Sequence, residues 1–233
     1  MEGPARKGFH RVAWDLRYSS QGVVSMGRSS SFGGGGFQAT PGTYTVTLSR
    51  QTDGKITPLA GPISFEVERL YKGVLQPASD DAIASFRQKM ESIQADVAIV
   101  SYLMNNSMTK VNAMQTALSR TRIAPGDLDA QLHDLQQKLY EMEEEMSGNQ
   151  SKEEIGERNP PSFRSRMFMG YRGLSTTYGP TPMHKESLEI AMRQMKSMKA
   201  KVEKISEQEI PRLEKALQAA GAPWIEGQAL PKN

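Results

Sequence analysis

Ser79 to Arg122 reads SDDAIASFRQKMESIQADVAIVSYLMNNSMTKVNAMQTALSRTR. Apolar residues recur in it at alternating steps of three and four, as on the buried face of a helix that packs along its whole length. They are Ile83, Phe86, Met90, Ile93, Val97, Val100, Met104, Val111, Met114 and Leu118. At about 1.5 Å per residue, such a helix is on the order of 60 Å long. A rod of this length needs other helices packed against it.

Capping residues mark the ends of this helix. Ser79 followed by two aspartates is a typical N-cap, with carboxylates near the positive end of the helix dipole. Pro125-Gly126 stops the helical pattern. Ser107 alone interrupts the apolar seam, and Met108 beside it can fill the gap.

Further apolar seams follow at helical spacing. The sequence predicts helices over about 79–122, 127–147, 162–177 and 182–219. Short connections favour antiparallel neighbours, so we expect an antiparallel bundle of three or four helices over 79–220, followed by a tail over 221–233. Pro211 should kink the last helix or split off a short final one. The long helix then forms the spine of the bundle, although its heptads also permit a coiled coil between two chains.

The residues before the long helix follow a different period. Phe9 to Tyr18 alternates, with Trp14 as its core residue, and so do Thr43 to Leu48 and Ile63 to Val67. A period of two is typical of strands with one buried face, and Asp53-Gly54 indicates a hairpin turn. We therefore expect a segregated α+β fold, with an antiparallel β-sandwich of Ig-like or fibronectin-like type over 5–76.

Residues 19–38 are rich in serine and glycine and end in the glycine run Gly33 to Gly36. This composition predicts a long loop. A phosphate-binding loop would need a strand that leads straight into a helix at this point, and the pattern predicts neither. No cofactor is therefore predicted.

Composition argues against several classes of protein. Hydrophobic residues make up 37% of the 233 residues, below the share of about 45–50% in typical globular domains, which fits long helices and thin layers. The net charge of +3 argues against nucleic-acid binding. The chain has no cysteine, which excludes disulfides and thiolate metal sites. It also has no run of about 18 apolar residues, so no membrane span is predicted.

The N-terminus carries no export signal of its own. Met1 to Gly8 lacks the apolar core of a signal peptide, and it directly precedes residues of the predicted sandwich. We therefore expect an excised fragment with an added initiator methionine. The localisation of the parent protein is not readable from such a fragment.

Isolated polar residues favour structural roles. His10, His133 and His184 fall in three separate elements, none with a second ligand at metal spacing, so no metal site is predicted. Asp15 beside Trp14 suggests the carboxylate of an aromatic-lined sugar site, but strand alternation places it on the face opposite Trp14, which favours a turn or salt-bridge role. The sequence contains no nucleophile elbow, zinc-protease motif or phosphate loop, and no catalytic residue is predicted.

One cluster is a candidate surface for an anionic ligand or a partner. Basic and aromatic side chains gather in and before the helix predicted over 162–177: Arg158, Arg164, Arg166, Arg172, Phe163, Phe168 and Tyr171. Guanidinium groups suit the recognition of carboxylates and phosphates. The pattern alone favours the more ordinary interpretation, in which basic residues flank a short amphipathic helix.

Three segments together resemble a known arrangement. They are GFHRVAWDLRY at 8–18, PGTYTVTL at 41–48 and FEV at 65–67, which leads into the long helix. They are similar to the C-terminal region of bacterial secreted proteins whose N-terminal part is a sialidase- or sortilin-type β-propeller with BNR repeats, labelled as glycosyl hydrolases. The resemblance implies an Ig-like or fibronectin-like module, a helical region, and a parent protein that is secreted, periplasmic or on the cell surface.

The same resemblance implies that this chain is not the catalytic part. The sequence contains no Asp-box of the propeller, and the glycosyl-hydrolase activity that the family name suggests would reside in that propeller, so no catalytic residue carries over. We expect a non-catalytic accessory module that binds its own upstream propeller, another protein or a glycan, and that is a monomer. Two alternatives stay open: a fragment that contributes to a glycoside hydrolase active cleft, and a helical scaffold that self-associates into a dimer.

Overall fold

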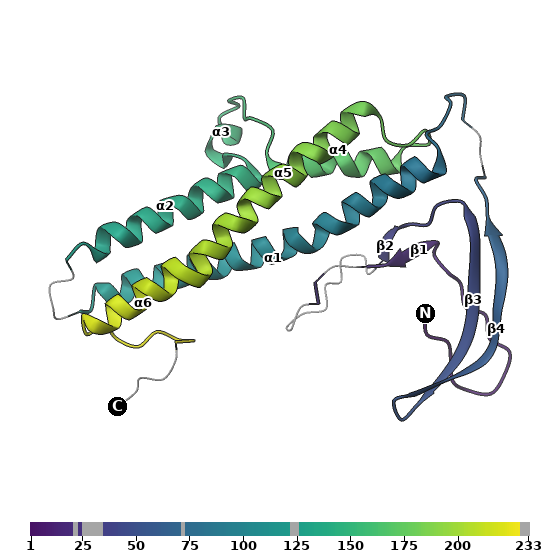
Figure 1. The fold of residues 1–233 in the computed structure, drawn as a ribbon, viewed down its shortest axis with the longest axis horizontal. Coiled ribbons are helices and arrows are strands. Elements are labelled where there is room, and N and C mark those ends of the chain that lie inside the picture. The colour runs from purple at the N-terminus through teal and green to yellow at the C-terminus, as the bar shows by residue number, and fades with distance from the viewer. Residues whose placement is uncertain (21–22, 25–34, 71–72, 122–125, 229–233) are drawn as a thin grey trace.

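The structure is a computed structural model that describes residues 1–233 except 21–22, 25–34, 71–72, 122–125 and 229–233. Its helices form one elongated bundle, and its strands lie near the N-terminal end of the longest helix (Figure 1). None of the described helices is both long enough and apolar enough to cross a membrane.

The longest helix, α1, runs from Asp80 to Leu118. The Ser79 hydroxyl accepts a hydrogen bond from the Ala82 backbone N–H at 3.3 Å, so the predicted N-cap is confirmed. Most of the predicted seam is buried in the core, and Ser107 is buried with it. The heptad spacing therefore identified the face along which the other helices pack.

Four further helices pack against α1 (Figure 1). They are α2 (Leu128–Ser147), α4 (Phe163–Ser175), α5 (Pro182–Lys204) and α6 (Ile210–Ala219), and the single-turn helix α3 (Gln150–Glu154) follows α2. Each of the four lies within its predicted range. Their leucines and methionines fill the core together with those of α1, so the seam of α1 is covered by helices of the same chain.

A π-helical turn, η1 (Ile205–Glu209), joins α5 to α6. A proline removes one backbone donor from a helix, and its ring crowds the carbonyl four residues before it. The π turn lies immediately before Pro211, and the backbone N–H of Ile210 bonds the Ile205 carbonyl across it. The structure has a short final helix, α6, which contains Pro211 and follows α5 through this π turn.

The predicted β-sandwich over 5–76, and with it the segregated α+β fold, is wrong. The structure is a helical bundle with a few strands: β1 (Arg17–Ser19), β2 (Gly35–Gln38), β3 (Gly42–Thr52) and β4 (Lys55–Val67). These strands form two small antiparallel sheets of two strands each, β1–β2 and β3–β4. A sandwich needs two larger sheets packed face to face around a shared core.

The β3–β4 hairpin shows why the alternating apolar pattern led to the wrong prediction of a sandwich. Its pairs Tyr44–Phe65 and Val46–Ile63 lie on one face, as predicted. Trp14 packs against Tyr44 and Phe65, and Tyr18 of β1 packs against Tyr44, but the face is largely open at Val46 and Ile63. Val46 is 48% exposed and Ile63 is 62% exposed. Alternation indicates an apolar face on a strand and does not indicate what packs against it. The predicted turn at Asp53-Gly54 is confirmed, since both residues have positive φ between paired strands.

One further strand prediction fails, and one loop prediction fails in part. Residues 9–16 form no strand, and the exposed Phe9 belongs to no core. Within the predicted loop over 19–38, Gly35–Gln38 forms β2 and pairs with β1, whereas 21–22 and 25–34 lie outside the described residues. Gly36 suits this pairing because a Cβ there would lie 2.7 Å from the Tyr18 carbonyl oxygen.

Candidate ligand-binding cleft

A cleft of about 710 Å³ lies between the bundle and the β1–β2 sheet. Helix α1 contributes Gln94, helix α4 contributes Arg164, Phe168 and Tyr171, and the sheet contributes Arg17 and Phe37. Small-molecule sites are typically concave, mostly apolar and roughly 300–1,000 Å³ in volume. The cleft therefore has the size of a ligand site, and it is built from segments that are distant in sequence.

Aromatic contacts hold the two walls of the cleft together. The Phe37 ring stacks on the Tyr171 ring, with centroids 5.6 Å apart and an interplanar angle of 23°. Gln94 Nε2 donates a hydrogen bond to the Tyr171 hydroxyl at 2.6 Å. Tyr171 is thus held from two sides, whereas Phe168, one turn earlier on α4, is 59% exposed.

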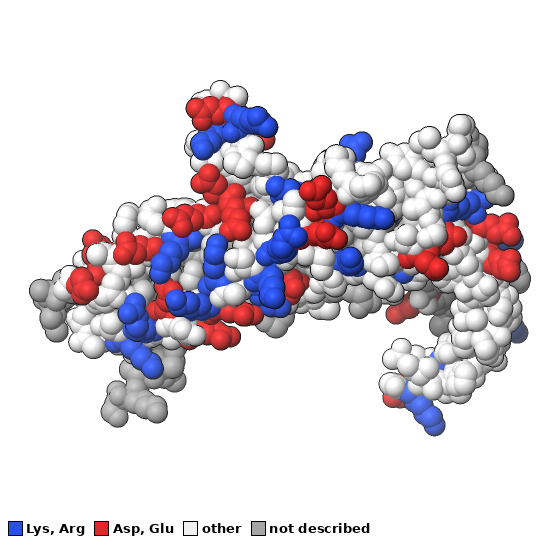
Figure 2. All heavy atoms as spheres, turned by 45° about the horizontal axis from the view of Figure 1, so that its top comes forward, with Lys and Arg blue, Asp and Glu red and all other residues white. Residues whose placement is uncertain are grey.

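The charged groups that line the cleft are all positive. Arg17 Nη1 donates to the Gly36 carbonyl at 3.2 Å, which places its guanidinium beside β2. Arg164 lies on the opposite wall, in the first turn of α4. The described lining contains no aspartate, glutamate, histidine or lysine. Elsewhere, Figure 2 shows positive and negative side chains interspersed over the helical face in view.

The predicted Arg/aromatic cluster divides in the structure. Phe163, Arg164 and Tyr171 line the cleft, together with Phe168. The remaining arginines, Arg158, Arg166 and Arg172, are not among its lining residues. Helical phase explains the division within α4, because positions 164, 168 and 171 are spaced by four and three and share one face.

Sequence reasoning missed Arg17, Phe37 and Gln94. Gln94 is one of many polar residues on α1, and no local pattern distinguishes it. Phe37 follows the glycine run, in a segment predicted to be a loop. The partner that would have drawn attention to it, Tyr171, comes from the far end of the chain.

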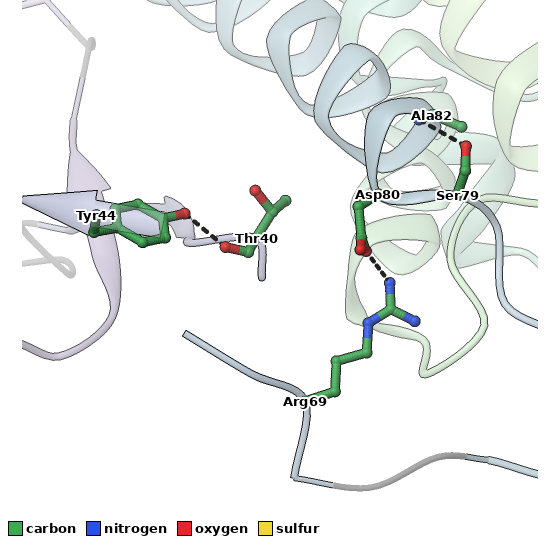
Figure 3. Close-up of polar contacts among 6 residues, drawn as sticks. All are labelled: Thr40, Tyr44, Arg69, Ser79, Asp80 and Ala82. Carbon is green, nitrogen blue, oxygen red and sulfur yellow. Dashed lines mark hydrogen bonds and ion pairs between the residues drawn. The ribbon is translucent and has the colours of Figure 1, made fainter. Parts of the chain in front are cut away.

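A second set of contacts joins the sheets to the start of the bundle. The Arg87 guanidinium lies 3.9 Å from the centroid of the Tyr18 ring. The hydroxyls of Tyr18 and Tyr44 are 2.8 Å apart, and Tyr44 donates to the Thr40 carbonyl at 2.6 Å. Figure 3 shows this last bond and the ion pair between Arg69, after β4, and Asp80 in the first turn of α1.

The two tyrosines titrate differently because they share these contacts. Burial opposes ionisation of Tyr18, but its hydrogen bond with Tyr44 and the charge of Arg87 outweigh burial, so its pKa is lowered. Burial and the interaction with Tyr18 raise the pKa of Tyr44. A negative charge on this pair is therefore expected to reside on Tyr18.

Asp15 and Trp14 lie together instead of on opposite faces. Both line a second groove, about 860 Å³ in volume, beside Tyr44 and Phe65. The prediction failed because residues 9–16 are not a strand and do not alternate. The turn role expected for Asp15 is seen: its Oδ1 accepts the Arg17 backbone N–H at 3.1 Å, and Trp14 Nε1 donates to the Arg17 carbonyl at 2.8 Å.

The histidines lie apart from both grooves. His184 Nδ1 accepts the Thr181 backbone N–H at 3.1 Å in a capping box at the start of α5, which is a structural role. Within the described ranges, no group of three or more histidine, aspartate or glutamate residues is arranged to hold a metal ion.

Comparisons with known proteins place this chain in no family. No protein-family model, no curated protein and no solved structure matches it. The resemblance to propeller-associated modules therefore stays a prediction that rests on residues 8–18, 41–48 and 65–67.

Proposed function

We propose that this chain is a non-catalytic binding module, and that its ligand or partner occupies the cleft between α1, α4 and the β1–β2 sheet. The observation that carries the proposal is the lining of the cleft. Arg17 and Arg164 stand among aromatic rings there, and the described lining offers no carboxylate, imidazole or amine for proton transfer. Such a surface suits the binding of a ligand, and the Tyr171 hydroxyl within it already accepts a hydrogen bond from Gln94.

The alternative of a glycoside hydrolase cleft has less support. Hydrolysis of a glycosidic bond normally uses two carboxyl groups about 5–10 Å apart. Neither the described lining of this cleft nor that of the second groove supplies a pair, since the first has no carboxylate and the second has only Asp15.

The alternative of a self-associating scaffold also has less support. The apolar seam of α1 that suggested a coiled coil is buried against helices of the same chain, with Met90, Val100 and Val111 fully inaccessible to solvent. A dimer built on that seam would have to displace α2 or α5, which would expose their apolar faces to water.

The resemblance supplies the proposed setting of the module. We infer from the three similar segments that the parent protein carries a β-propeller and is exported, with the propeller as first partner. The loss of the predicted sandwich removes the structural part of that resemblance. The gene sequence that precedes Met1 tests the setting directly: propeller repeats would support it, and an unrelated upstream sequence would contradict it.

Nuclear magnetic resonance and an activity assay together test the binding proposal. Labelled protein is titrated with a panel of small cationic, neutral and anionic ring compounds. Shifts should appear at the Gln94 side-chain amide and at backbone amides near Phe37 and Tyr171. Aryl glycosides, including a sialoside, should not be hydrolysed by the same sample. Turnover, or a panel that shifts no residue of the cleft, would contradict the proposal.

A further inference from the structure

We infer that the cleft takes a small aromatic carboxylate, with the carboxylate between Arg17 and Arg164 and the ring among Phe37, Phe168 and Tyr171. This inference rests on the proposed function, since it names the chemical class of the ligand for the same cleft. It adds a mechanical consequence: the bound ligand bridges β1 to α4.

The charge of the cleft selects an anion. Its two guanidinium groups come from separate elements, and among the described residues no carboxylate forms an ion pair with either. Ion pairs between elements do occur elsewhere in the bundle, as in Lys199–Asp96 at 2.6 Å and Lys138–Glu209 at 2.9 Å. A guanidinium offers two parallel N–H donors that match the two oxygens of a carboxylate.

The walls of the cleft select a planar apolar body. The Phe37 ring of the sheet and the Tyr171 ring of α4 stack nearly parallel across the cleft, and the hydrogen bond from Gln94 fixes the Tyr171 ring. Phe168 stands exposed beside them, and the guanidinium of Arg172 lies 5.9 Å from its ring centroid. Aromatic rings pack favourably at centroid separations of about 4.5–7 Å, so the exposed Phe168 ring beside this stack is the surface on which a further ring can pack.

The position of the cleft links binding to the sheet. The β1 strand has three residues and β2 has four, and isolated two-stranded sheets are marginal in water. A ligand that touches both Arg17 and Arg164 ties this small sheet to the bundle. Binding should therefore slow amide hydrogen exchange in β1 and β2, because exchange there requires the sheet to open locally.

Matched probes test the charge requirement. 2-Naphthoate and its neutral amide, 2-naphthamide, have the same ring and nearly the same shape. By calorimetric or spectroscopic titration, we expect the acid to bind the intact chain at least about tenfold more tightly than the amide, as one charge-assisted bidentate pair provides. Arg164→Gln should remove most of this preference. Arg158→Gln removes one positive charge outside the cleft, and this variant should keep the preference for the acid.

Each outcome bears on a specific part of the inference. Equal binding of the two probes at the cleft would overturn the anion requirement and leave the binding function standing. If neither probe nor any compound of the panel shifts the cleft residues, both fail. An equal loss in Arg158→Gln and Arg164→Gln would reveal a diffuse charge effect and overturn the site.

Two further measurements distinguish a local effect on binding from the misfolding of a variant. Arg164→Lys retains the charge without the planar fork, and it should show an intermediate preference if the protein is folded. Amide exchange with and without 2-naphthoate tests the bridge. Unchanged exchange in β1 and β2 at saturating ligand would overturn the bridging role.

Discussion

Arg87 stacks on the ring of Tyr18 at 3.9 Å, and this cation–π contact joins the first turns of α1 to β1. Arg87 is buried, and an ion pair of 3.8 Å with Glu91 holds it along α1. The strands therefore meet the bundle through a desolvated guanidinium as well as through the Phe37–Tyr171 stack. Phe37 also packs against the apolar core of the bundle.

Arg87→Leu should lower the free energy of unfolding by about 1–2 kcal/mol, because it removes a partly desolvated cation–π contact. Urea unfolding followed by circular dichroism measures this change. Lys89→Leu alters an exposed residue of the same helix and should stay within about 0.5 kcal/mol of the parent. Equal effects of the two substitutions would contradict a specific role for the contact with Tyr18.

Tyr18 should ionise below the pH at which an ordinary tyrosine does, because its pKa is lowered by Tyr44 and Arg87. A spectrophotometric titration of the chain near 295 nm should show one early step that disappears in Tyr18→Phe. Tyr44→Phe, which removes the hydrogen-bond partner, should move that step toward the ordinary pKa. An unchanged titration curve in Tyr18→Phe would contradict the assignment.

The direction of the linked stability follows from the same pKa. The folded pKa of Tyr18 lies below the unfolded one, so ionisation favours the folded state. This contribution is fully present above the unfolded pKa and is lost as the pH falls through the folded pKa. The parent should therefore gain stability as the pH rises between the folded and the unfolded pKa of Tyr18, and Tyr18→Phe should lack this gain.

Met114→Ala should destabilise the chain by about 2–5 kcal/mol, since it leaves a cavity in a fully buried part of the α1 seam. Tyr102 on the same helix is 66% exposed, and Tyr102→Ala should cost less than about 0.5 kcal/mol.

The unfolding midpoint of the parent should not depend on protein concentration, because the seam is filled within one chain. A midpoint that rises with concentration would indicate a dimer.

Gly173→Ala should destabilise the protein more than Gly170→Ala does. A Cβ at Gly173 would lie 3.0 Å from Cβ and Cγ of His184, close to the backbone of α5. At Gly170 the nearest atom is Met90 Sδ at 2.9 Å, near the flexible end of its side chain, which can move. Each alanine gains about 1 kcal/mol in helix propensity. Thermal unfolding should therefore show a loss at Gly173 and a smaller change at Gly170, and the reverse order would contradict this packing.

The helices were predictable because their signals are local. Apolar steps of three and four, and the cap at Ser79, act within one or two turns of the backbone. The glycines of α4 show the limit of such signals. The low helix propensity of Gly170 and Gly173 argues against a helix at these positions. The close approach of Met90 to Gly170 and of His184 to Gly173 explains why glycine is present there.

The strands and the cleft depend on contacts between distant segments. Alternation correctly predicted that Tyr44 and Val46 share a face, but a strand pattern is the same whether or not a second sheet covers it. The sequence pattern revealed the half of the cleft that α4 forms, as a cluster of basic and aromatic residues. The other half consists of Arg17 and Phe37. They lie near α4 only in the folded chain, and a local sequence pattern cannot predict such a long-range contact.

The π turn accommodates one extra residue between the buried faces of α5 and α6. From His184 to Ile205 the buried positions advance by alternating steps of four and three, and the next buried position is Ile210, five residues on. This step has the same effect as inserting one residue into an α-helix. Because η1 holds the extra residue in a single widened turn, α5 and α6 both keep their apolar faces on α1. An irregularity in length that proteins usually place in a loop is absorbed here within a helix.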